Sequence, residues 1–223
     1  MNSKKFFSTY TGWLILINVI FFVIELLMVY SNPENIKYFA IKPAQILQGK
    51  YLWTFLTSMF AHSPIGLTHI LFNMVSLLFL GGFVEKLIGK KRFLGLYMFG
   101  GLFASLIFVL FAGFFGVTDL GAKLFGNPKS IALGASGAIF ALGGLLAVIT
   151  PKMKVLVMFI IPLPMWAAMI GLTFVLWAVS LGLPLMIGNT AHVGGLVVGI
   201  IYGFYLKIKY PNKTRMISRY FAR

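Results

Sequence analysis

The sequence contains no cysteine, and acidic residues are almost as scarce, with four in 223 residues. The absence of cysteine excludes disulfide bonds, a thiol nucleophile and any metal site with thiolate ligands. Only 10% of the residues are charged, whereas about a quarter are charged in a typical soluble domain. The chain is therefore not composed like a soluble globular protein.

What replaces charge is hydrophobic sequence, which makes up 60% of the chain. Several apolar runs of about 16–25 residues follow one another, each close to the length that crosses a bilayer. We therefore predict an all-α polytopic membrane protein with one domain, 1–223, because no polar linker interrupts the series. The first run is expected to be a retained helix rather than a signal peptide, since no small-residue cleavage site follows it. The predicted spans are 12–30, 67–83, 93–116, 131–150, 165–181 and 191–206, followed by a basic tail, 207–223.

Two connecting segments are unusually apolar. The loop 31–66 is too apolar to float in water, so we expect short helices in the membrane interface, with Tyr51 and Trp53 as anchors. The segment 155–164 contains Pro162 and Pro164, and we interpret it as a re-entrant or interfacial approach to the fifth span.

The net charge of +15 first suggests a nucleic-acid partner, but the basic residues lie in short clusters between spans. That distribution indicates membrane topology. With six spans, 14 of the 19 lysines and arginines lie on the side that holds both termini. The positive-inside rule then predicts cytoplasmic termini, with the tail touching anionic lipid and no nucleic-acid partner.

This topology places the N-terminal ends of the second, fourth and sixth spans on the same outer side. Those ends carry His69 and Asn73, then Ser136, then His192. A serine hydroxyl becomes a nucleophile when a base takes its proton, and histidine has a suitable pKa. We predict Ser136 as nucleophile and His192 as base. His69 and Asn73 share one helix face and could donate to an oxyanion, together with a backbone amide.

Small residues on the fourth and sixth spans fit this pairing. Gly195, Gly199 and Gly203 recur at four-residue spacing, and such stripes let membrane helices approach closely. Gly137 leaves room for a substrate backbone beside Ser136. Phe140, one turn after the serine, is a candidate ring for the imidazole to stack on.

No acidic residue is an evident partner for His192, so a serine–histidine dyad is favoured over a triad. Glu25 is expected to have a structural role in the first span. A zinc site on the three histidines would usually have a carboxylate behind it, and none is evident. No metal or other cofactor is expected.

Each of these residues also has a plainer interpretation. Ser136 alone would be a helix-packing serine, and His192 alone a hydrogen-bonded histidine between helices. His69 and Asn73 could bond only to loop backbone, and His62 is expected to be structural. It is the combination that favours chemistry.

The residues also resemble a known family, the rhomboid intramembrane serine proteases, in their prokaryotic-type six-span core. The matching pieces are His69-Ile70-Leu71-Phe72-Asn73, Gly134-Ala135-Ser136-Gly137 and Ala191-His192-Val193-Gly194-Gly195. The resemblance implies cleavage of single-span membrane proteins near the outer membrane face, at small residues in unstable helical segments. It also implies a multi-pass protein of a prokaryotic plasma membrane.

The same resemblance assigns roles. It implies Ser136 and His192 as catalytic residues, with His69, Asn73 and the Ser136 amide as the oxyanion site. Gly134 and Phe140 match the motif glycine and the aromatic that packs on the base, and Glu85 matches a structural hydrogen-bond acceptor. A non-catalytic relative that escorts membrane clients, or a small-solute channel, remain alternatives. The fifth span and loop 182–190 are candidate gates, and the oligomeric state is not predicted.

Overall fold

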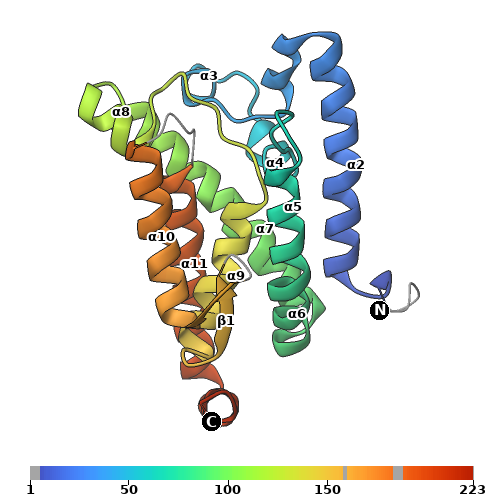
Figure 1. The fold of residues 1–223 in the computed structure, drawn as a ribbon, viewed down its shortest axis with the longest axis vertical. Helices are drawn as coiled ribbons and strands as arrows, with labels where there is room; N and C mark the ends of the chain where they lie inside the picture. The colour runs from blue at the N-terminus through green and yellow to red at the C-terminus, as the bar shows by residue number, and fades with distance from the viewer. Residues whose placement is uncertain (1–5, 158–159, 183–187, 223) are drawn as a thin grey trace.

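The computed structural model describes residues 6–157, 160–182 and 188–222, and nearly all of its regular structure is helical (Figure 1). Five helical runs are long and apolar enough to cross a membrane within these ranges. They are α2 (Tyr10–Ser31), the run Thr68–Ile88, the run Lys90–Phe115, α10 (Met165–Gly182) and α11 (Asn189–Lys209), with a shorter apolar helix, α9 (Ser136–Ile149), among them. The predicted helical membrane bundle is confirmed.

Two of the long runs change their winding part-way. The first consists of α5 (Thr68–Ser76), a π-helical turn η2 (Leu77–Gly81) and α6 (Gly82–Ile88). The second consists of α7 (Lys90–Leu110) and a π-helical turn η3 (Phe111–Phe115). Both extend into charged sequence that was expected to be loop. Glu85 is tolerated in α6 because its carboxylate is buried and accepts hydrogen bonds from Tyr10 N and from Thr11 N and Oγ1 at 2.7–2.9 Å.

The first loop and the outer connections contain short helices, as predicted for 31–66. These are η1 (Pro33–Tyr38), α3 (Pro43–Ile46) and α4 (Thr54–Thr57), and a further helix, α8 (Asp119–Phe125), follows η3. Figure 1 shows α3 and α8 at one end of the bundle, while α2 begins and the chain ends at the other. Trp53 is half exposed, and its indole N–H donates to the Tyr38 carbonyl at 3.2 Å.

Helix α9 occupies the centre of the bundle. Twelve of its 14 residues are buried, and it packs against α7, α10 and α11 (Figure 1). A helix that is apolar all round can be surrounded by other helices in this way because it has no polar face that needs contact with water. Its first residue is Ser136, so the Gly134-Ala135-Ser136-Gly137 motif lies where the central helix of the fold begins.

The fourth span was predicted as 131–150, but α9 begins only at Ser136. The preceding residues are not helical, and two of them form backbone hydrogen bonds with the first loop. Ile41 and Ala132 exchange two hydrogen bonds of 2.9 Å, and Gly134 N donates to Ser58 O at 2.8 Å. Because this segment descends before turning into helix, α9 starts below the ends of α5 and α10 (Figure 1).

Two other segments contain structure that the sequence did not predict. Residues 155–164 were predicted as a re-entrant or interfacial approach to the fifth span, and in this segment β1 (Lys154–Val157) pairs antiparallel with β2 (Ile161–Pro164). Pro162 and Pro164 are two residues apart, so both nitrogens face away from β1, where no ladder hydrogen bond is needed. The basic tail contains a further helix, α12 (Pro211–Tyr220), which is separated from α11 by Tyr210 alone.

Candidate active site

Ser136 and His192 meet at the start of their helices. Ser136 Oγ lies 2.8 Å from His192 Nε2, although the two residues are 56 positions apart. Ser136 is partly exposed, whereas His192 is 9% exposed. This distance is within hydrogen-bond reach, which is the geometric requirement for proton transfer between a serine and a base.

The close approach of α9 and α11 depends on glycines facing carbonyl groups. A Cβ atom on Gly195 would collide with the Gly137 carbonyl oxygen, and one on Gly199 with the Ala141 carbonyl oxygen. The same holds from the other helix: a Cβ atom on Gly144 of α9 would collide with the carbonyl oxygen of Leu196 in α11. The glycine stripe noted in the sequence is therefore the contact surface that brings His192 to Ser136.

The imidazole of His192 is held by packing. Its ring lies parallel to that of Phe140, with 4.4 Å between centroids and 3° between planes. Nδ1 is buried and has no hydrogen-bond partner among the described residues. The arrangement has the form of a dyad in which an aromatic face, not a carboxylate, orients the base.

A second polar cluster lies beside the serine. Gly134, two residues before Ser136, has a φ of 124°, which side chains other than glycine rarely adopt. A Cβ there would also lie 2.9 Å from His69 Nε2 and 3.6 Å from Asn73 Nδ2. The backbone next to Ser136 therefore passes directly against both side chains that α5 contributes.

Hydrogen bonds determine which N–H groups of His69 and Asn73 are available to donate. Ser63 N donates to His69 Nδ1 at 3.3 Å, so a neutral His69 ring carries its proton on Nε2, the atom that faces Gly134. Asn73 Nδ2 donates to the His69 carbonyl at 3.1 Å and retains a second N–H. Both residues can thus present donors near Ser136, where a carbonyl oxygen would gain charge.

The ring of His62 packs against the ring of His69, a contact that the sequence did not predict. The two rings are 5.1 Å apart in an edge-to-face arrangement, and His62 is fully buried. Burial lowers the pKa of His62 to about 3, with the neighbouring His69 lowering it further and the bond to the Phe60 carbonyl opposing the shift. His62 is therefore neutral and supports His69 by packing.

Glu25 has the structural role expected of it. Its Oε2 accepts a 2.8 Å hydrogen bond from the backbone N–H of His62, which ties α2 to the first loop. Most of loop 182–190, a candidate gate, lies outside the described residues. Asn189, near the end of this loop, is described, and its Nδ2 donates a 2.6 Å hydrogen bond to Ser180 Oγ, which links α11 to α10.

Comparison with known proteins gives a consistent result. Residues 49–209 match the family model described as "Rhomboid domain". The chain is 31% identical over 197 residues to rhomboid protease GluP of Bacillus subtilis, covering 86% of this chain and 33% of the relative. It is 30% identical over 173 residues to RHOMBOID-like protein 1 of Arabidopsis thaliana, covering 76% and 38%. Mitochondrial rhomboid protein 1 of Saccharomyces cerevisiae is 30% identical over 152 residues, covering 67% and 40%. The chain thus spans 33–40% of the length of these three relatives.

Proposed function

This chain belongs to the rhomboid family of integral multi-pass membrane proteins, and from that premise we propose that it is an intramembrane serine endopeptidase. The observation that carries the proposal is the 2.8 Å contact between Ser136 Oγ and His192 Nε2, with the imidazole stacked on Phe140. No soluble cofactor or metal ion takes part in the reaction proposed.

The reaction begins with proton transfer from Ser136 Oγ to His192 Nε2. The oxygen attacks the carbonyl carbon of the scissile peptide, and the resulting imidazolium gives its proton to the leaving amine. Water then attacks the acyl-enzyme, with His192 again taking and returning a proton. Stacking on Phe140 keeps Nε2 directed at Oγ in both halves of the reaction, which a freely rotating ring would not do.

The tetrahedral intermediates need donors for their oxyanion. Three groups support this role: the backbone N–H of Ser136 at the start of α9, the Nε2–H of His69 and the free N–H of Asn73. Gly134 keeps the space between them open, since any side chain there would meet His69 first. Gly137 leaves the next position clear for substrate backbone.

The depth of the site supports a substrate that lies within the bilayer. Helix α9 begins below the ends of α5 and α10 (Figure 1), so in the orientation proposed below, Ser136, its first residue, would lie beneath the outer membrane surface. We propose that the substrates are single-span membrane proteins cleaved near the outer face. A helical peptide carbonyl is hydrogen-bonded, so segments with low helix propensity and small residues are the expected targets.

The proposed orientation places both termini in the cytoplasm, which follows from the basic residues that gather at the end of the bundle carrying α12. A prokaryotic plasma membrane is the proposed location.

The test is cleavage of a panel of single-span substrates by the purified protein in liposomes. Ser136→Ala and His192→Ala should each lower the rate by a factor on the order of 10⁴. Ser31→Ala, which alters an exposed serine at the end of α2, is the matched control and should cleave like the native chain. Cleavage that survives Ser136→Ala would show that another group performs the reaction.

A further inference from the structure

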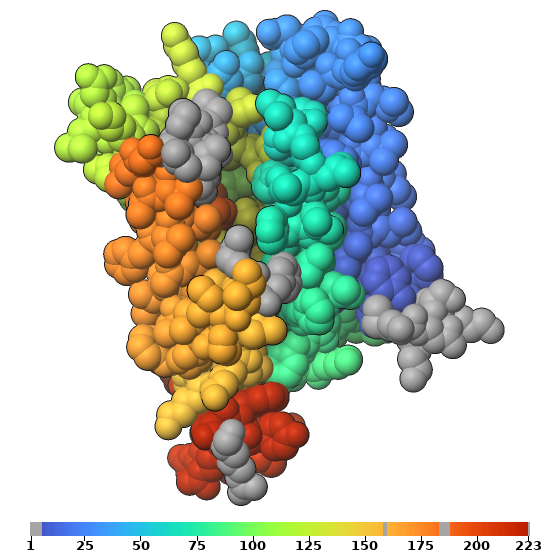
Figure 2. All heavy atoms as spheres, in the orientation of Figure 1, coloured from blue at the N-terminus to red at the C-terminus, as the bar shows by residue number. Residues whose placement is uncertain are grey.

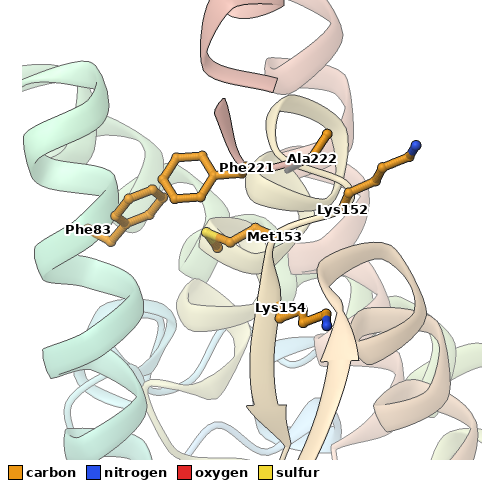
Figure 3. A pocket seen from close by; sticks show the side chains of 6 residues that line it. All are labelled: Phe83, Lys152, Met153, Lys154, Phe221 and Ala222. Carbon is orange, nitrogen blue, oxygen red and sulfur yellow. The ribbon is translucent and has the colours of Figure 1, made fainter. Parts of the chain in front are cut away.

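A cavity of about 720 Å³ (Figure 3) lies at the end of the bundle that holds α6 and the C-terminus (Figure 1). We call it the C-terminal cavity. Its lining comes from α6, from the turn between α9 and β1, from the first residue of β1 and from the residues after α12: Phe83, Lys152, Met153, Lys154, Phe221 and Ala222. The space-filling view shows the C-terminal segment at this end of the molecule, beneath β1 and β2 (Figure 2).

The lining combines apolar and cationic groups. The rings of Phe83 and Phe221 meet edge to face with 5.4 Å between centroids, and Met153 is partly buried beside them. Lys152 and Lys154 are exposed and lie on the other side of Met153 from the two rings (Figure 3). Such a lining suits a molecule that has an anionic group and an apolar body.

Helix α12, which carries Phe221 into the cavity, has the character of a helix that lies in the membrane interface. Thr214 is its buried residue, and Ile217 packs against the core. Met216 and Tyr220 are 67% and 74% exposed, and the charged residues Lys213, Arg215 and Arg219 are exposed as well. Basic side chains beside exposed apolar ones are typical of helices that bind anionic membrane surfaces.

Among the described residues, no side-chain carboxylate is free to balance the basic charge at this end. The nearby acid, Glu85, is buried and its oxygens accept bonds from the start of α2. Glu25 is buried in α2 and accepts a hydrogen bond from His62 N, and Glu34 and Asp119 lie in η1 and α8, at the opposite end. The described part of the chain therefore presents Lys152 and Lys154 with no carboxylate that would compete with an external anion.

We propose that the C-terminal cavity binds one anionic phospholipid. The lipid phosphate lies on Lys152 and Lys154, and the glycerol and upper acyl chains contact Phe83, Met153 and Phe221. A lipid is favoured over a soluble phosphate because four of the six lining residues are apolar and because the cavity opens beside the ends of membrane-spanning helices. This site is separate from Ser136 and does not depend on proteolysis.

The experiment counts lipids bound to the full chain in detergent by native mass spectrometry. Phosphatidylglycerol is titrated against phosphatidylcholine with the same acyl chains. The native chain should retain one phosphatidylglycerol in preference to phosphatidylcholine. Lys152→Gln with Lys154→Gln should weaken phosphatidylglycerol binding roughly 25-fold, since each lysine near a membrane surface contributes about fivefold.

The control is Lys123→Gln with Lys129→Gln, which removes the same charge from exposed lysines at the opposite end and should change binding less than about twofold. Phe221→Ser should weaken phosphatidylglycerol but leave binding of inorganic phosphate unchanged. Equal losses in both double variants, equal binding of the two lipids, or phosphate binding as tight as lipid binding would each overturn the proposal. Unfolding temperatures without lipid confirm that each variant is folded.

Discussion

Replacing Gly199 with alanine tests whether helix contact sets the catalytic geometry. Gly199 lies two turns after His192, about 10 Å along α11, and touches no group proposed to react. The new methyl group would collide with the Ala141 carbonyl oxygen, which belongs to helix backbone and cannot rotate away. The helices must therefore separate, by roughly 1 Å, to restore ordinary contact.

That separation has two measurable consequences. Adding roughly 1 Å to the 2.8 Å distance between Ser136 Oγ and His192 Nε2 takes it beyond hydrogen-bond reach. A misplacement of this size lowers catalysis by about 10²-fold, even when it originates away from the reacting atoms. Crowding in a packed helix interface should also reduce the free energy of unfolding by about 1–3 kcal/mol.

The assay compares initial rates of substrate cleavage in liposomes with unfolding temperatures in detergent. Gly95→Ala is the matched control, because this helical glycine in α7 has open space where its Cβ would lie. That variant should cleave at the native rate and be slightly more stable. If Gly199→Ala cleaves like the native chain, close packing of α9 and α11 does not govern the dyad.

Three further predictions concern the groups around the site. Gly134→Ala should lower cleavage by about 10²-fold, measured as initial rate, because its Cβ meets His69 Nε2 at 2.9 Å; a native rate would exclude His69 from the oxyanion site. Glu25→Ala should reduce the free energy of unfolding by about 1–3 kcal/mol more than Glu25→Gln, since only glutamine keeps an acceptor for His62 N–H; equal losses would contradict this. The pKa of His62 is lowered to about 3, so the unfolded chain binds the extra proton and stability should fall as pH drops below about 6.5. His62→Gln should flatten that decline in thermal unfolding between pH 7 and pH 5, and an unchanged slope would assign it to other groups.

Local sequence was enough to predict the parts of the fold that depend on hydrophobicity. The positions of the long helices follow from apolar length. Even-numbered spans begin on the same side of the bundle, which predicted that Ser136 and His192 lie at one end, and the structure adds the 2.8 Å contact between them. The glycine stripe on α11 indicated close packing before any partner helix was known. Phe140 lies on the helix face expected of a ring that supports the base.

The features that escaped prediction depend on contacts between distant segments. The late start of α9 results from pairing between Ile41 and Ala132, which no local pattern encodes. The support of His69 by His62 likewise depends on a loop path that Glu25 fixes from another helix. The pairing of β1 with β2 was not predicted because proline usually indicates that a segment is not a strand. In a two-stranded ribbon each strand has an unpaired outer edge, where proline's missing N–H costs no ladder hydrogen bond.

The central claim is that His192 activates Ser136. The most direct measurement is labelling of the folded protein by a serine-directed fluorophosphonate, with the adduct located by peptide mass spectrometry. The native chain should gain one adduct, on Ser136, and Ser136→Ala should gain none. His192→Gln should label at least about 10²-fold more slowly, because the hydroxyl then lacks its base. Two results would contradict the account: an adduct on another serine, or labelling of Ser136 in His192→Gln at the same rate as in the native chain.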